Sequence, residues 1–187
     1  MIYLLFGKSG VGKTTIYKRL IEDDELGLTP IVTCTTRPPR PGEVNEVDYY
    51  FISEEEFHEL ESTGELMEST SYQVANGDTW YYGSLFKDFM DDKDRLIIVN
   101  PHGIRAIIRK CISYNIPTKA ILLTASRRTR LQRLSVRGDD IAEVKRRMQA
   151  DDKDFFLVNE LANRRINTSR LSIDEVVKKI KKTIKKE

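Results

Sequence analysis

Short apolar runs alternate along this chain with segments whose apolar residues recur at helical spacing. The apolar runs predict buried strands at 1–6, 95–100, 119–124 and 155–159. The amphipathic segments predict helices at 15–21, 103–114 and 172–187, the last with an apolar stripe of Ile173, Val176, Val177, Ile180 and Ile184. Buried strands that alternate with helices are typical of a doubly wound α/β fold with a parallel sheet.

A different pattern fills the stretch between the first and second of these strands. Strands rich in β-branched and aromatic residues are expected at 30–36, 47–52, 65–68 and 69–74. Ser53 and Glu56 form the capping-box pattern of a short helix that Gly64 ends. Asn76-Gly77 indicates a turn. This stretch therefore predicts a separate, strand-rich lobe.

The first strand runs directly into a phosphate-binding motif. Residues 7–14 match G-x-x-x-x-G-K-[ST] at every fixed position and lie between a strand and a helix. The residues expected to bind the phosphates of ATP are Gly7, Lys8, Ser9, Gly10, Val11, Gly12, Lys13, Thr14 and Thr15. Glycines let backbone N–H groups approach the phosphates, Lys13 reaches the β- and γ-phosphates, and the Thr14 hydroxyl is the expected Mg²⁺ ligand.

Composition narrows the class of protein without naming a reaction. The 187 residues fit one domain, and a net charge of +2 gives no global reason to expect nucleic-acid or membrane partners. Cys34 and Cys111 lie far apart and in no metal-binding spacing. With no leader or membrane-length apolar segment in the sequence, we expect a cytoplasmic protein, monomeric or homodimeric, that binds small-molecule nucleotides.

A proline-rich segment at 37–43 carries Arg37 and Arg40 on a stiff backbone. A stiff backbone lowers the entropy lost when an arginine clamps an anion, and a guanidinium matches phosphate oxygens in pairs. A surface loop with incidental basic residues is the alternative.

Taken together, these segments resemble the guanylate kinase family. The resemblance rests on the phosphate loop, Thr35 to Phe51, the Gly-Glu-Leu-Met-Glu at 64–68, the Tyr-Tyr-Gly at 81–83 and the Arg-Leu-Ser-Val-Arg-Gly at 133–138, in family order over nearly the whole chain. It implies a P-loop NTPase-type core at 1–33, 87–125 and 155–187, an acceptor-binding lobe at 34–86 and a lid at 126–150. It also implies direct Mg²⁺-dependent phosphoryl transfer from ATP to GMP or dGMP.

The resemblance implies roles for individual residues. Those expected around GMP are Thr33, Arg37, Arg40, Tyr49, Glu68, Tyr82, Ser84 and Asn100. The residues expected to act in phosphoryl transfer are Lys13, Arg37, Arg133, Arg137 and Arg147. Arg133 and Arg137 are also expected to bind ATP, and Asn159 is expected near the adenine end of the ATP pocket. A solvated charged face is the simpler interpretation of Arg127, Arg128 and Arg130.

Base chemistry independently supports a role for Glu68. Guanine presents N1–H and a 2-amino group, and an ionised carboxylate only accepts hydrogen bonds, so the two match. Adenine presents an acceptor at N1, which a carboxylate disfavours. A solvated strand carboxylate is the alternative for this residue taken alone.

The chain departs from the family pattern at the end of the 95–100 strand. Ile98 and Asn100 stand where the family usually has two acidic residues, and His102 follows, for which a structural hydrogen bond is the simpler role. Glu46 replaces a usual glycine, and the 69–80 segment is longer than usual. Two alternatives to a GMP kinase follow. The protein phosphorylates another nucleoside monophosphate, a deoxynucleotide or ribose 1,5-bisphosphate, or it is a catalytically silent interaction module.

Overall fold

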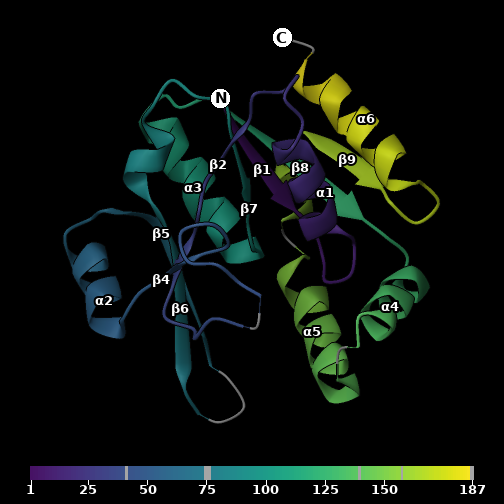
Figure 1. Cartoon of the computed structure of the whole chain (residues 1–187), viewed down its shortest axis with the longest axis horizontal. Helices are drawn as coiled ribbons and strands as arrows, with labels where there is room; N and C mark the ends of the chain where they lie inside the picture. Colours follow the sequence, from purple (N-terminus) through teal and green to yellow (C-terminus); the bar gives the residue numbers. More distant parts are fainter. Residues whose placement is uncertain (41, 74–76, 139, 157, 186–187) are drawn as a thin grey trace.

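The computed structural model has a five-stranded parallel sheet at its centre (Figure 1). The structure describes residues 1–40, 42–73, 77–138, 140–156 and 158–185. The strands lie in the order β2 (Thr29–Pro30), β7 (Arg95–Ile98), β1 (Ile2–Phe6), β8 (Thr118–Thr124), β9 (Arg164–Asn167), and every pairing is parallel. Because β1 is central, the loop that follows it opens at the middle of the carboxyl edge of the sheet, where open α/β sheets place their ligands.

Helices cover both faces of this sheet. On one face, α3 (Pro101–Ser113) packs Ile104, Ile107 and Cys111 against alternate residues of β1. The opposite face packs against α1 (Lys13–Ile21) and α6 (Ile173–Ile184), and both chain ends lie at the same end of the molecule (Figure 1). The doubly wound α/β prediction is confirmed. In the predicted α6 stripe, however, Ile173, the first residue of the helix, is exposed.

A second sheet stands beside the first. Its order is β4 (Tyr50–Phe51), β3 (Cys34–Thr35), β6 (Thr79–Leu85), β5 (Leu66–Gln73), with α2 (Glu54–Ser62) packed on it through Phe57. The capping box of Ser53 and Glu56 is present as predicted. The strands predicted at 30–36 and 47–52 are shorter than expected, since the prolines and turns around them interrupt pairing. The predicted turn at Asn76 begins outside the described residues.

The chain between β8 and β9 is helical. α4 (Arg127–Val136) and α5 (Ile141–Asp154) contact each other through Leu134, Val144 and Met148. The strand predicted at 155–159 was wrong: the described part of that segment is turn followed by the short 3-10 helix η2 (Asn159–Leu161), and the last strand is β9. Another 3-10 helix, η1 (Phe86–Phe89), leads from β6 towards β7. Within the described ranges, no helix is long and apolar enough to cross a membrane.

Candidate active site

The loop between β1 and α1 has the backbone conformation that its glycines allow. Gly10 has a φ of 78°, and a Cβ there would lie 2.8 Å from the carbonyl oxygen of Arg130. Gly7, with a φ of 153°, is more tightly held, because a Cβ would lie 2.3 Å from the carbonyl oxygen of Leu123 on β8. The loop therefore fits against the end of the sheet only without side chains at these positions.

Lys13 is folded back over this loop. Its Nζ donates to the carbonyl oxygens of Gly7 at 2.6 Å and Lys8 at 3.3 Å. Burial lowers the pKa of Lys13 to about 8, opposed by the carboxylate of Asp151. A buried ammonium near its pKa is stabilised by an incoming anion, so the position is prepared for a phosphate.

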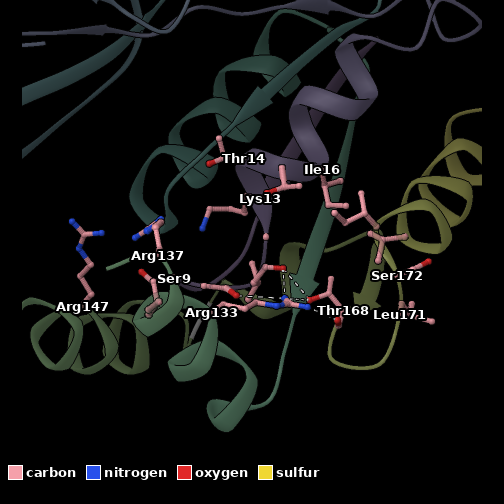
Figure 2. A pocket seen from close by; sticks show the side chains of 17 residues that line it. Ser9, Lys13, Thr14, Ile16, Arg133, Arg137, Arg147, Thr168, Leu171 and Ser172 are labelled. Atoms are coloured by element: carbon pink, nitrogen blue, oxygen red, sulfur yellow. Dashed lines mark hydrogen bonds between the residues drawn. The ribbon is translucent and has the colours of Figure 1, made fainter. Parts of the chain in front are cut away.

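A cavity of about 580 Å³ lies over the loop and the start of α1. Figure 2 shows Lys13 and Thr14 on one side of it, with Arg133, Arg137 and Arg147 reaching it from the segment of α4 and α5. Thr168, Leu171 and Ser172, which no sequence pattern had indicated, complete the lining next to β9. Asn159, the first residue of η2, is not among the lining residues of this cavity.

Arg133 supports the loop from behind. Its guanidinium donates to the carbonyl oxygen of Val11 at 3.1 Å and to the hydroxyl and carbonyl oxygens of Thr168 at 2.9 Å and 2.8 Å (Figure 2). The Thr168 hydroxyl donates in turn to the Val11 carbonyl at 2.9 Å. Arg133 thus fixes the loop backbone as well as facing the cavity.

Asp151 on α5 contacts the loop at another point. Its carboxylate accepts from the backbone N–H of Ser9 at 2.8 Å and from Arg130 at 3.2 Å. Burial raises the pKa of Asp151, with Lys13 and Arg130 acting in the opposite direction. The solvated interpretation of Arg130 was wrong, since only 4% of this residue is exposed.

The structure also tests whether the loop can hold Mg²⁺. The Thr14 hydroxyl lines the cavity at the start of α1 and has no hydrogen-bond partner in the part of the chain that the structure describes. The same part contains no group of three or more His, Cys, Asp or Glu residues suited to a metal. One hydroxyl beside a phosphate site suits Mg²⁺, which keeps several waters and takes its other ligands from substrate phosphates.

A second cavity, of about 630 Å³, opens between the two sheets and α5. Its walls bring together five of the residues expected around GMP: Thr33, Tyr49, Glu68, Tyr82 and Asn100. Ser9, Lys13 and Arg147 line this cavity and the first one alike. The two cavities therefore adjoin each other at these three residues.

Glu68 lies at the inner end of the second cavity and is 8% exposed. Its Oε1 accepts from the Ser84 hydroxyl at 3.1 Å, while Oε2 is buried without a partner. Burial raises the pKa of the Glu68 carboxyl to about 7. Ser84 is fully buried behind the carboxylate and is not a lining residue, so its contact with a ligand would pass through Glu68.

Arg37 and Arg40, the two arginines of the proline-rich segment at 37–43, do not line this cavity. Arg37 is 3% exposed and makes a bidentate ion pair with Glu43, with N–O distances of 2.8 Å and 2.9 Å. Its guanidinium also lies over the rings of Tyr49 and Phe51. Arg40 is exposed to solvent. Of the residues expected around GMP, Tyr49 and Tyr82 thus line the cavity, and Arg37 lies behind Tyr49.

A glycine-rich loop on a doubly wound sheet, with a buried lysine that lines two adjoining cavities, defines a phosphate-loop protein. The family model for guanylate kinase matches residues 1–187, and the chain belongs to the guanylate kinase family. That membership supports an enzyme that phosphorylates GMP with ATP.

Individual relatives agree with the family match. The chain is 34% identical to the guanylate kinase of Mycoplasmoides gallisepticum, over 83% of this chain and 78% of the relative. It is 32% identical to that of Latilactobacillus sakei, over 98% and 97%. The crystal structure of guanylate kinase from Anaplasma phagocytophilum superposes with a TM-score of 0.71 at 21% identity, over 98% of this chain and 84% of that one, which shows a shared fold.

Proposed function

We propose that this protein transfers the γ-phosphoryl group of ATP to the phosphate of GMP, with the first cavity as donor site and the second as acceptor site. The observation that carries the proposal is that Lys13 and Arg147 line both cavities. A phosphate oxygen of GMP forms the new bond to the γ-phosphorus, and the bond from that phosphorus to the β,γ-bridging oxygen breaks. ADP leaves with the bonding electron pair, and GDP is the other product.

On the donor side, each residue has a distinct task. The loop N–H groups and Lys13 hold the β- and γ-phosphates, and Thr14 supplies the protein's ligand to Mg²⁺, which neutralises developing charge when bound. Arg147, which lines both cavities, and Arg137, which lines the donor cavity, stabilise charge on the moving group. Arg133 acts mainly as a positioning residue, because its guanidinium is bonded to the loop and to Thr168.

On the acceptor side, Glu68 recognises the base and the tyrosines recognise the phosphate. A carboxylate with one buried, unpartnered oxygen accepts from the guanine N1–H. Tyr49 and Tyr82 present their hydroxyls to the acceptor phosphate from an edge-to-face ring pair whose centroids are 6.2 Å apart. Arg37 reaches the phosphate by exchanging one of its bonds to Glu43. dGMP shares the base and phosphate contacts and is included as an acceptor.

Two segments are proposed to move during the reaction. The segment 34–86 carries Glu68 and the acceptor tyrosines on the second sheet, and the segment 126–150 carries the three donor-side arginines on α4 and α5. Their approach brings the two phosphates into line and excludes water. A cytoplasmic location fits the two free cysteines, both of which are buried.

The experiment is a nucleotide separation after incubation with ATP, Mg²⁺ and one acceptor at a time. We expect equal amounts of ADP and GDP from GMP, the corresponding products from dGMP, and less than about one thousandth of that rate from AMP, CMP, UMP and dTMP. If another nucleotide or ribose 1,5-bisphosphate is phosphorylated faster than GMP, that compound is the acceptor and the proposal is wrong. ATP binding without transfer to any acceptor would favour a silent interaction module.

A further inference from the structure

The base end of the acceptor cavity is built around two side chains and one glycine. A Cβ placed on Gly103 would lie 3.1 Å from Oε2 of Glu68 and 3.3 Å from Oδ1 of Asn100. The two oxygens therefore flank the same point at the start of α3. Both are hydrogen-bond acceptors on the wall of this cavity, so the bonds that each already makes determine which purine donors it can still accept from.

The amide oxygen of Asn100 is already occupied. It caps α3 by accepting from the backbone N–H groups of His102 at 2.9 Å and Gly103 at 2.6 Å. The amide nitrogen of Asn100 donates to the Thr70 hydroxyl at 3.1 Å. Asn100 is among the residues expected around GMP and lines the cavity, but its amide oxygen is engaged in the helix cap and is therefore a poor acceptor for a guanine amino group.

Glu68 retains one acceptor without a partner. Ser84 donates to Oε1, and Oε2 is buried with no hydrogen bond in the described part of the chain. A buried acceptor without a partner is unfavourable until a ligand supplies a donor. The donor common to all 6-oxopurines is N1–H, whereas the 2-amino group belongs to guanine and is absent from hypoxanthine.

We propose that the pocket recognises 6-oxopurine nucleotides as a class, so that the protein phosphorylates inosine monophosphate as well as GMP. The inference rests on the proposed function and deepens it by naming the acceptor range. The transfer is the same: an oxygen of the inosine monophosphate phosphate bonds to the γ-phosphorus, ADP leaves with the electron pair, and inosine diphosphate forms. Adenine stays excluded, because its N1 is an acceptor facing the Glu68 carboxylate.

Inosine monophosphate is expected to be accepted because its missing 2-amino group leaves no buried protein atom without a hydrogen-bond partner. A pocket rejects an analogue strongly when the missing group leaves a buried protein atom without its partner. Removal of the 2-amino group leaves no oxygen of Glu68 or Asn100 without a partner. Ser84 bonds Oε1 of Glu68, N1–H would bond Oε2, and the N–H groups of α3 bond the Asn100 oxygen. Loss of the 2-amino group should therefore change catalytic efficiency only modestly.

The test compares kcat/KM for GMP and inosine monophosphate in the wild-type protein and two variants at pH 8. Asn100→Asp keeps the cap with one oxygen and replaces the amide nitrogen with a second acceptor. Asn100→Ser keeps a capping oxygen and adds no acceptor. We expect a wild-type preference for GMP of less than about thirtyfold, a preference at least about tenfold larger in Asn100→Asp, and a preference within about threefold of wild type in Asn100→Ser.

A wild-type preference for GMP above about thirtyfold would overturn the proposal, and so would an unchanged preference in Asn100→Asp. Failure of the proposed function would look different, because GMP itself would then not be phosphorylated. In that case titration calorimetry with each nucleotide still measures base recognition. Similar dissociation constants for GMP and inosine monophosphate would support recognition of 6-oxopurines as a class, and a preference for GMP above about thirtyfold would overturn it.

Discussion

The carboxylate of Asp151 accepts the backbone N–H of Ser9 at 2.8 Å, so a side chain of α5 sits on a donor of the phosphate loop. An acceptor of the same charge sign as a phosphate thus occupies an amide of the phosphate loop. ATP must displace this contact or bind beside it. The position of α5 is thereby linked to occupancy of the donor site.

Neutralising Asp151 should strengthen ATP binding. Asp151→Asn keeps the size of the side chain and removes the charge near the incoming phosphates, so we expect ATP to bind about three- to tenfold more tightly in calorimetry without acceptor. Asp152→Asn is the matched control, because Asp152 is half exposed and pairs with Lys8. Weaker binding by Asp151→Asn would instead mean that the carboxylate helps to hold the nucleotide or its metal.

Recognition by Glu68 should depend on pH. Its pKa of about 7 means that the free protein binds a proton there as the pH falls below 7, and the protonated oxygen no longer matches N1–H. GMP affinity should be flat above this pKa and fall about tenfold per pH unit well below it. Calorimetry from pH 5.5 to 8.5 measures the slope, and Glu68→Gln should bind GMP weakly without that slope. A parallel slope in Glu68→Gln would assign the titration to another group.

The same carboxyl should lower stability at neutral and higher pH. Its folded pKa of about 7 exceeds the ordinary glutamate value of 4.5, so the folded state binds more protons and stability falls as pH rises from about 4.5 to 7. Glu68→Gln should therefore be more stable than wild type at pH 8, by at most about 3 kcal/mol. Urea denaturation at pH 4 and pH 8 tests this, and an equal difference at both pH values would contradict it.

Gly7 should tolerate no side chain. Gly7→Ala places a Cβ against the Leu123 carbonyl of the central sheet, so we expect a loss of about 3 kcal/mol or more of unfolding free energy and loss of ATP binding. Gly27→Ala is the control, since Gly27 also has positive φ, at 57°, but a Cβ there meets nothing within 4 Å. Its loss should be about 1–2 kcal/mol, from backbone strain alone. Equal losses in the two variants would refute the close contact.

The Thr14 hydroxyl should set the magnesium requirement. Thr14→Ala should raise the Mg²⁺ concentration for half-maximal activity by about tenfold, because the protein's single ligand is lost. Mn²⁺ binding to the ADP complex, followed by electron paramagnetic resonance, should weaken in parallel. Thr15→Ala, at the adjacent exposed threonine, which is expected on the ATP phosphates and not on the metal, should change both values less than Thr14→Ala does. A larger effect at Thr15 would reassign the ligand.

The sequence predicted the parts of the fold that local patterns determine. The phosphate loop, the strand before it and the capping box at Ser53 follow from short-range chemistry, and each is present. The segment 155–159 misled because a short apolar run also suits a buried turn: Phe155 and Val158 enter the core beside α3, and Phe156 is 80% exposed. The true edge strand has only Ile166 buried, so its pattern is weak.

Long-range partners were beyond the sequence. The Ser9–Asp151 and Arg37–Glu43 contacts were not predicted, the first because it joins residues 142 positions apart. Asn100, expected around GMP, lines the second cavity, but the sequence analysis did not anticipate that its amide oxygen caps α3 ahead of Pro101. A single amide oxygen cannot be assigned between helix cap and ligand until the helix start is located.

The most direct test of the account is a competition experiment with γ-labelled ATP, Mg²⁺ and equimolar GMP and AMP in one reaction, run with wild type and Glu68→Ala. The account predicts that wild-type protein places label in GDP at least about a thousandfold faster than in the product from AMP. In Glu68→Ala that preference should collapse by about a hundredfold or more, because the acceptor for N1–H is lost. A preference for GMP that survives the loss of Glu68, or label transferred first to AMP, would contradict it.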